Sequence, residues 1–433
     1  MTTILGICFI INVVLTKTEK AHQPPGVIGR DAILPYQMRY RWVMVFLAWL
    51  LYSVFGLVLR SISPLITPII TDLNIPYAQM GLILGAWPLT YILVALVAGN
   101  LIDRWGIRRS LLLGTIIIGL SEVLRYFTNG FWALFFMVAL FGVGGPLISI
   151  GCPKTIAEWF RGKDRGTAIG IYTTGPWIGG IMAYSMTNSV VMPLTGNNWR
   201  LAFVVYGAIV FIAALVWWFM ARDVKTATGT GETASLAKVF TGLIKLRNIQ
   251  LLLIMGFLVF TVSHGFNDWL PKLLEIGGLP PAIAGFAASI PLVVGIPGVL
   301  IIPRFTPLHL RGRMVALMSL GIAGALLITA VASGASLVAG LVIYGIAECS
   351  VLPLLMLVLM ELPEVGSKYM GSAGGMFFCA AEVGGFAGPL LMGAIKDLTG
   401  SFLGGASALS ATAVAMAIMA LFLKTSGTEE TKA

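Results

Sequence analysis

The stretch "GNLIDRWGIRRS", Gly99–Ser110, places one aspartate and three arginines in the seven residues Asp103–Arg109. Residues 80–102 before it carry no charge, and the segment after it is apolar again. Charged side chains are costly inside a bilayer, so a short charged break of this kind indicates a loop between two apolar spans. The rest of the chain repeats this alternation of long apolar runs and short polar breaks.

The composition is typical of a membrane protein. The chain has 433 residues, of which 58% are apolar and only 11% are charged, whereas soluble domains have about 25% charged residues. Its apolar runs are continuous over roughly 20 residues or more, as helices that cross a bilayer require, and they lack the alternation of barrel strands. We therefore expect an all-α polytopic membrane protein. The net charge of +10 lies in short loops, so it indicates membrane orientation rather than nucleic-acid binding.

Twelve apolar spans are predicted. Their expected ranges are 43–69, 80–102, 110–128, 131–157, 166–190, 201–221, 250–270, 282–303, 314–333, 335–358, 370–394 and 401–423. Lys and Arg concentrate in alternate loops, which by the positive-inside rule places both termini in the cytoplasm. The short loops favour a prokaryotic inner (plasma) membrane.

The longest hydrophilic break divides the twelve spans into two sets of six, and its first part is rich in Gly and Thr, as flexible linkers are. The predicted parts are an N-terminal cytoplasmic extension at 1–37, a six-helix bundle at 38–221, a cytoplasmic linker at 222–249, a second six-helix bundle at 250–424 and a tail at 425–433. The apolar run 4–15 is too short to span a bilayer. We therefore expect the first 37 residues to be a disordered or interfacial extension. Alternatively, translation begins functionally at Met38, and the residues before it come from an upstream start codon.

The stretch "GNLIDRWGIRR" resembles the loop signature of the major facilitator superfamily, Gly-x-Leu-x-Asp-Arg-x-Gly-x-Arg-Arg, and follows the second span as it does in that family. The resemblance covers about residues 38–424 and implies two six-helix bundles that rock about a central cavity. It also implies a gating loop, in which the aspartate latches onto span 11. The gating residues are Gly99, Asp103, Arg104, Gly106, Arg108 and Arg109. The second-half copy has Ile302 in place of the acid, so a latch there is weaker or absent.

Arg60 is an ionisable residue within the first span and is therefore a functional candidate. It precedes Pro68 by eight residues, which resembles the organic-anion branches of the superfamily, including cyanate-permease-like, glycerol-phosphate and sugar-acid transporters. The resemblance implies that Arg60 faces the cavity and binds an anionic group, and a guanidinium suits carboxylate or phosphate. The alternative is an arginine that snorkels to the headgroups or forms a structural pair.

Span 7 contains "SHGFNDWLPKLL", residues 263–274, whose Asp268, Trp269 and Pro271 resemble the same branches. Phosphate-ester exchangers carry a second arginine where this chain has Ser263, so a monoanion or small carboxylate is favoured over a phosphate ester. His264 and Asn267 are candidate substrate ligands. His264 is also a candidate proton site, with a purely hydrogen-bonded histidine as the alternative.

Two carboxylates stand alone in apolar spans. Glu348 in span 10 and Glu382 in span 11 are candidate proton-coupling residues, or they brace hydrogen bonds between helices. Glu122 and Arg125 lie three apart in span 3 and are expected to pair with each other as a structural element. The aromatic residues that line the cavity, or else pack against other helices, are expected to be Trp87, Tyr91, Tyr172 and Trp177.

The sequence thus predicts a proton-coupled secondary transporter (a symporter) for a small organic anion, acting as a monomer in the bilayer. It has no Gly-rich Lys-Ser/Thr phosphate loop, and no residue cluster with catalytic spacing, so we expect neither an enzyme nor a bound cofactor. Its cysteines, Cys8, Cys152, Cys349 and Cys379, lack metal-site spacing. The alternatives are an efflux pump for lipophilic or cationic compounds, in which Arg60 is structural, and a non-transporting sensor on the same scaffold.

Overall fold

The computed structural model describes residues 35–223 and 241–423. Within these ranges the chain is helical and forms no strand. The predicted extension at 1–37, the linker at 222–249 and the tail at 425–433 fall largely or wholly outside the described residues.

The first half of the chain begins with a long helix that is followed by several shorter pieces. Its α-helices are α2 (Pro35–Ser61), α3 (Ile66–Leu73), α4 (Tyr77–Leu84), α5 (Ala86–Trp105), α6 (Ile107–Leu124), α7 (Phe131–Trp159), α8 (Lys163–Thr173), α9 (Gly175–Met186), α10 (Met192–Leu194) and α11 (Trp199–Met220). Short 3₁₀ turns occupy η1 (Ser63–Leu65) and η2 (Arg125–Phe127), and η3 (Thr187–Val191) is a π-helical turn.

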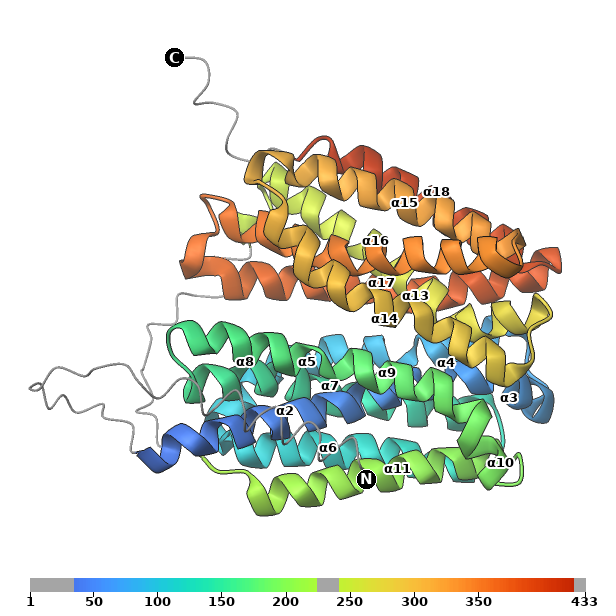
Figure 1. The fold of residues 1–433 in the computed structure, drawn as a ribbon, viewed down its shortest axis with the longest axis horizontal. Coiled ribbons are helices and arrows are strands. Elements are labelled where there is room, and N and C mark those ends of the chain that lie inside the picture. Colours follow the sequence, from blue (N-terminus) through green and yellow to red (C-terminus); the bar gives the residue numbers. More distant parts are fainter. Residues whose placement is uncertain (1–34, 224–240, 424–433) are drawn as a thin grey trace, which may run out of the picture. The chain divides into compact units, whose positions relative to one another are not determined.

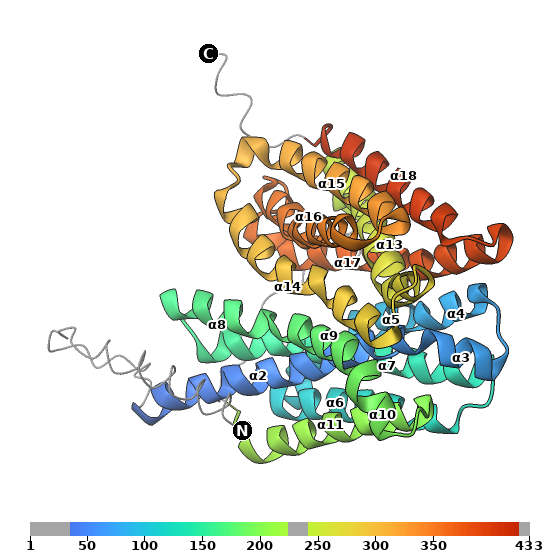
Figure 2. The same cartoon turned by 45° about the vertical axis from the view of Figure 1, so that its right-hand side comes forward.

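The second half is built from longer, less interrupted helices. These are α13 (Arg247–Ile276), α14 (Pro281–Phe305), α15 (Arg311–Val331), α16 (Gly334–Glu361), α17 (Gly366–Thr399) and α18 (Phe402–Ala420), with the 3₁₀ turn η4 (Leu308–Leu310) before α15. In Figures 1 and 2 the blue-to-green helices of the first half gather in one group and the yellow-to-red helices of the second half in another.

Eleven helical segments of the described chain are long and apolar enough to cross a membrane, judged by length and composition. The remaining predicted span, 166–190, is not one continuous helix. It is divided into α8 and α9, which meet at Thr174. Pro176 lies in the first turn of α9, where its missing N–H costs least. The α9 segment then passes through the π-turn η3 into the short helix α10.

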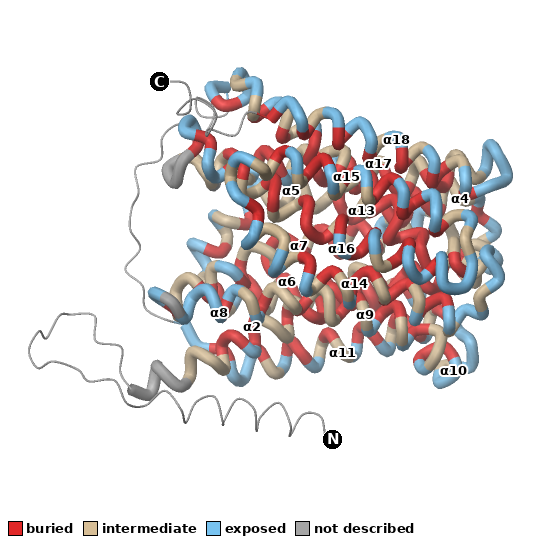
Figure 3. The backbone as a smooth tube through the Cα atoms, turned by 45° about the horizontal axis from the view of Figure 1, so that its top comes forward, coloured by how far each residue is buried: buried red, intermediate tan, exposed pale blue. Residues whose placement is uncertain are grey.

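The surface of the helices is suited to lipid. Buried residues follow the inward faces of the helices in Figure 3, while many large apolar side chains are exposed, such as Trp132 (65%), Phe219 (76%) and Phe305 (74%). Exposed apolar surface of this extent is rare on soluble monomers. The fold therefore matches the expected all-α polytopic architecture.

Glycines allow the helices to approach closely within and between the two halves. Within the first half, a Cβ on Gly142 of α7 would collide with the Trp87 carbonyl of α5, and within the second half a Cβ on Gly384 of α17 would collide with the Phe257 carbonyl of α13. Between the halves, Gly81 of α4 lies against the backbone of Pro389 of α17. Close packing of this kind replaces the hydrophobic driving force that lipid cannot supply.

We expect Gly142→Ala to lower the melting temperature of the purified protein in detergent, because overpacking of a tight interface costs about 1–3 kcal/mol. Gly324→Ala on α15 is the matched control, since a Cβ there meets no atom within 4 Å. Ala is the better helix former by roughly 1 kcal/mol, so the control should be neutral or slightly stabilising. Equal melting temperatures for both variants would contradict the close contact of α5 and α7.

Candidate functional site

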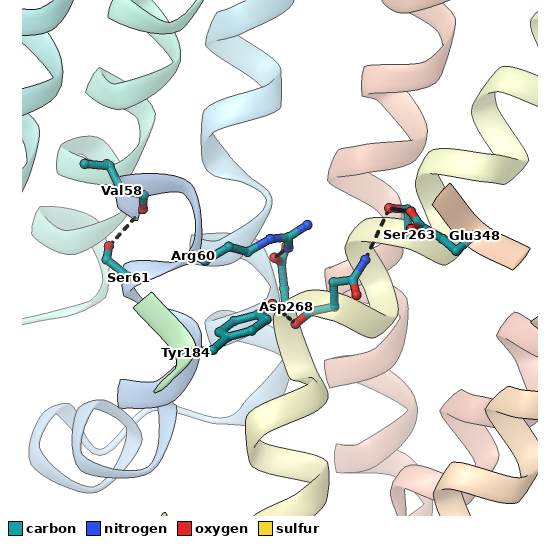
Figure 4. Close-up of polar contacts among 8 residues, drawn as sticks. Val58, Arg60, Ser61, Tyr184, Ser263, Asp268 and Glu348 are labelled. Carbon is teal, nitrogen blue, oxygen red and sulfur yellow. Dashed lines mark hydrogen bonds and ion pairs between the residues drawn. The ribbon is translucent and has the colours of Figure 1, made fainter. Parts of the chain in front are cut away.

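Arg60 and Asp268 form a buried ion pair that joins the two halves of the chain. Arg60 lies in the last turn of α2 and Asp268 lies in α13, and their side chains are 10% and 4% exposed. Figure 4 shows Arg60 reaching from α2 toward α13. The guanidinium donates to Asp268 Oδ1. The predicted anion ligand therefore already holds a carboxylate, which belongs to the other half of the protein.

Local sequence explains why both groups lie where they do. The α2 helix ends at Ser61, just before η1 begins at Ser63 with Pro64 in its first turn, so Arg60 stands at a helix end. In α13, Pro271 has no N–H and leaves the carbonyl of Asn267 without its helical donor. Tyr184 of α9 supplies the missing donor, because its hydroxyl donates to Asn267 O at 2.6 Å.

A polar chain continues from this point toward α16. The Asn267 amide donates to Ser263 Oγ at 3.4 Å, and the Ser263 hydroxyl donates to Glu348 Oε1 at 2.5 Å. The Cys349 thiol donates to Glu348 Oε2 at 3.3 Å. The structure thus brings the predicted residues Asn267 and Glu348 into one hydrogen-bonded cluster, next to the ion pair.

His264 and Glu382 form a second cluster. The His264 ring lies between Trp87 of α5 and Phe260, with centroid distances of 5.4 and 5.2 Å. A Cβ built on Gly385 would lie 3.1 Å from Glu382 Oε2 and 3.5 Å from His264 Nδ1, so both atoms face the same small space. Both atoms are buried, and neither has a hydrogen-bond partner among the residues that the structure describes.

Glu382 also lines a cavity between the halves with a volume of about 320 Å³. The lining residues are Tyr91, Ile92, Ala95, Leu96 and Ile150 of the first half and Gly375, Phe378, Cys379 and Glu382 of the second. The Tyr91 hydroxyl hydrogen-bonds with Ser149 Oγ at 2.8 Å. This volume is at the lower end of the range for small-molecule pockets.

A larger and more open cavity of about 930 Å³ is lined by Thr67, Asp72 and Glu275, among others. Thr67 hydrogen-bonds to Glu275, and the Lys272 ammonium donates to Thr67 at 2.8 Å. Three residues follow one another along α13: His264, which is close to Glu382; then Asp268; then Glu275, which lines the open cavity. On α13 the partner of Arg60 therefore stands between the cluster of His264 and Glu382 and the open cavity.

The remaining predicted aromatic ligands differ in their surroundings. Trp87 packs on Tyr91 and Phe141 as well as on His264. Tyr172 instead packs against Tyr52, with a centroid distance of 5.9 Å, and Trp177 lies near Gly295 of α14. None of Trp87, Tyr172 and Trp177 lines the 320 Å³ cavity. Their role as substrate ligands stays a prediction.

The predicted gating loop connects α5 and α6. Gly106 has φ +82°, a conformation that favours glycine, and a Cβ on Gly99 would meet no atom within 4 Å. Asp103 pairs with Lys154 of α7 in the same half. The expected latch of Asp103 onto span 11 therefore has no support in this conformation and stays a prediction.

The arginines of this loop differ in their environments. The Arg108 backbone N–H donates to Asp223 at 3.2 Å, its carbonyl accepts from the Trp217 indole at 2.9 Å, and its guanidinium lies over the Trp218 ring. Arg108 thus anchors the loop to the end of α11. Arg104 and Arg109 are exposed.

Sequence reasoning missed the partner of Arg60. Asp268 belongs to a motif that the sequence singles out, yet nothing in a single sequence links two residues 208 positions apart. Tyr184 was also missed, although a proline four residues after Asn267 is a signal that this carbonyl needs another donor. The expected pair of Glu122 and Arg125 is present at 2.6 Å.

Comparisons with known proteins identify the scaffold. The sequence profile of the Major Facilitator Superfamily matches residues 48–389. The chain is 25% identical to the hexuronate transporter of Bacillus subtilis, over 86% of this chain and 93% of that one. It is 26% identical to the probable sulfoacetate transporter of Cupriavidus necator, over 76% and 81%. The crystal structure of a nucleoside transporter superposes with a TM-score of 0.75 at 15% identity, covering 89% of this chain and 99% of that one.

We expect Asp268→Asn to destabilise the protein, because it leaves the buried Arg60 without a counter-charge, at a cost of about 3–5 kcal/mol. Replacement of both partners in Arg60→Met/Asp268→Leu should recover most of the loss. Asp72→Asn is the matched control, because it breaks the partly exposed pair of Asp72 with Arg200, which is worth about 0–1 kcal/mol. Thermal unfolding in detergent measures all three, and equal stability of the two single variants would contradict the buried pair.

Proposed function

Since the chain belongs to the major facilitator superfamily, we propose that it moves a small organic anion of the carboxylate type across the membrane by alternating access. The chain is an integral membrane protein and a transporter rather than an enzyme. The observation that carries the proposal is the buried Arg60, which meets a carboxylate at the boundary of the two halves.

Arg60 is suited to a competitive exchange of carboxylates. A guanidinium binds the carboxylate of a substrate with the geometry that it uses for Asp268. Because Asp268 belongs to the second half, a substrate that displaces it removes a link between the halves. Binding of the anion would then favour their relative movement, as a ligand must do if it drives a conformational change.

The relatives support an anionic substrate. The two sequence relatives reported above are named for hexuronate and sulfoacetate, which are small organic anions. Ser263 occupies the place of a second arginine, which favours a monoanion over a phosphate ester. The 320 Å³ cavity is large enough for a sugar acid. Tyr91 and Trp87 are the aromatic residues that we place beside the substrate.

We further propose that transport is coupled to protons. Glu382 Oε2 and His264 Nδ1 are buried atoms near Gly385 that have no hydrogen-bond partner among the described residues, and Glu348 hydrogen-bonds into the chain that leads to Asn267. Buried carboxylates and histidines are the usual groups of proton relays in transporters. Glu382 and His264 are our first candidates, with Glu348 as the third.

The proposed topology follows the distribution of Lys and Arg. We place the protein in a plasma (inner) membrane with both termini on the cytoplasmic side. The two helix bundles comprise residues 38–221 and 250–424, and the linker at 222–249 between them is cytoplasmic. The 103–109 loop then faces the cytoplasm as a gating loop. We propose that a single chain is the transporting unit.

The anion assignment predicts a ligand-dependent rise in melting temperature. D-glucuronate, a monoanion, should stabilise the purified protein, by about 2.7 kcal/mol at a concentration 100 times the Kd. The stabilisation should vanish in Arg60→Gln and persist in Arg200→Gln, the matched control on the partly exposed pair with Asp72. Stabilisation by tetraphenylphosphonium alone, unchanged in Arg60→Gln, would refute the anion assignment and support efflux of lipophilic cations.

The coupling assignment predicts different behaviour for net transport and exchange. In proteoliposomes, Glu382→Gln should abolish accumulation of D-glucuronate driven by an inward proton gradient, yet retain exchange of internal for external substrate. Glu364→Gln, an exposed carboxylate just before α17, is the control and should behave as the wild type. Proton-driven accumulation that survives in Glu382→Gln, His264→Asn and Glu348→Gln alike would exclude all three candidates.

A further inference from the structure

The start of α4, in the first half, is bound by a side chain of α17, in the second half. The backbone N–H groups of Tyr77 and Ala78 donate to the two carboxylate oxygens of Asp397, at 3.1 and 2.7 Å. Asp397 lies in the last turn of α17, which ends at Thr399. This contact joins the halves through two hydrogen bonds, and the function proposed so far does not use it.

The helix α4 lacks a cap of its own. The first N–H groups of a helix have no acceptor within it, and in α4 the Met80 N–H donates to the Pro76 carbonyl at 3.1 Å to close the first turn. Pro76 precedes the helix, and its side chain makes no capping hydrogen bond. Serine, threonine, aspartate or asparagine is preferred at such a position. Asp397 therefore supplies, from the other half, the cap that the sequence of α4 does not provide.

The backbones of α4 and α17 lie unusually close around this cap. A Cβ on Gly393 of α17 would lie 2.2 Å from the Tyr77 carbonyl oxygen, and a Cβ on Gly81 of α4 would lie 2.4 Å from the Pro389 carbonyl oxygen. Residue numbers rise along α4 as they fall along α17, so the two helices run antiparallel. A larger residue at Gly393 would push them apart at the capped end.

The Tyr77 side chain extends this contact to the neighbourhood of the buried ion pair. Its ring packs on Trp269 and Phe402, with centroid distances of 5.9 and 5.5 Å, and the Lys396 ammonium lies 5.6 Å from its centroid. All three partners belong to the second half. Trp269 directly follows Asp268 in α13, so the capped end of α4 packs against the residue next to the acid of the ion pair.

Toward the opposite end of these helices, a cavity separates the halves. The 320 Å³ cavity is lined by Tyr91 of α5 and Cys379 of α17, among others. Beyond it, Asp103 stands in the last turn of α5 and pairs with Lys154 of its own half. In this conformation Asp397 is thus bound across the halves, whereas Asp103 is bound within one half.

We propose that Asp397 is a positioning residue that holds the halves together at the start of α4, and that its two hydrogen bonds break when the halves separate there. In alternating access, the opening of one end accompanies the closure of the other. Asp397 is then the counterpart of Asp103, whose predicted latch would form at the opposite end when that end closes. The proposal rests on the proposed alternating access and adds a contact that sets the balance between the two conformations.

The strength of the contact suits one that breaks in every cycle. Asp397 is exposed, and loss of a helix cap changes an equilibrium by about twofold to thirtyfold. Other contacts join the halves on the same side, such as the hydrogen bond from Lys272 to Thr67 at 2.8 Å. Removal of the Asp397 carboxylate should therefore shift the balance of conformations without unfolding the protein.

Distances between spin labels, measured by double electron–electron resonance on the full chain in nanodiscs without substrate, test the proposal. In a background without the native cysteines, Leu194→Cys/Leu398→Cys labels exposed positions of both halves at the end where α4 begins, and Trp105→Cys/Phe305→Cys labels the opposite end. Asp397→Ala should raise the ratio of separated to joined molecules at the first pair by about twofold to thirtyfold. The second pair should move closer.

Two further variants and a matched control sharpen the test. Gly393→Ala should move both pairs in the same directions as Asp397→Ala, because its Cβ collides with the Tyr77 carbonyl. Asp397→Asn keeps one accepting oxygen and should shift the distances less. Asp72→Ala breaks an ion pair with Arg200 inside the first half, and its distances should match the wild type. A purely structural role of Asp397 would lower the melting temperature without moving the two pairs in opposite directions.

Wild-type distances in Asp397→Ala would overturn the proposal, whatever Gly393→Ala does. The measurement needs no substrate, so it is separate from the test of the proposed function. Failure of the wild type to transport D-glucuronate would count against the proposed function, and the distances would still decide the role of Asp397.

Discussion

The ion pair of Arg60 with Asp268 is the constraint on which the arrangement of this protein depends. It places an arginine and a carboxylate, one from each half, where neither is solvated. Desolvation makes such a pair a weak source of stability, while loss of one partner is strongly unfavourable. The pair therefore contributes little net stability, but the buried Arg60 always requires an anionic partner. Asp268 is that partner here, and another anion could replace it.

The local structure of α2 and α13 places the two charged side chains together. The end of α2 at Ser61 puts Arg60 at a break between helices, and Pro271 frees the carbonyl of Asn267, the residue directly before Asp268 in α13. Along α13, Asp268 lies between His264, which is close to Glu382, and Glu275, which lines the open cavity. The proposed exchange of anions at Arg60 would thus take place where α2 ends and where Pro271 frees one carbonyl inside the continuous helix α13.

The sequence predicted the fold well, because continuous apolar runs and charged loops such as 103–109 depend only on local composition. It also singled out Arg60, Glu348 and Glu382 as candidates, since an ionisable residue in an apolar span is conspicuous, and their roles stay predictions. It could not find that Asp268 holds Arg60, because a contact between spans 1 and 7 has no local signal. The prediction that Glu122 and Arg125 pair with each other was right about the contact, but spacing alone could not reveal that Ser61 of α2 contacts both side chains.

The hydrogen bond from Tyr184 to the Asn267 carbonyl has a further consequence. Tyr184 belongs to the first half and Asn267 to the second, and the freed carbonyl has no helical donor because of Pro271. When the halves separate at this point, only water can take the place of the phenol. In the proposed alternating access, opening therefore requires water to enter as well as the halves to move, and solutes too large to enter with the water would oppose it by osmotic stress.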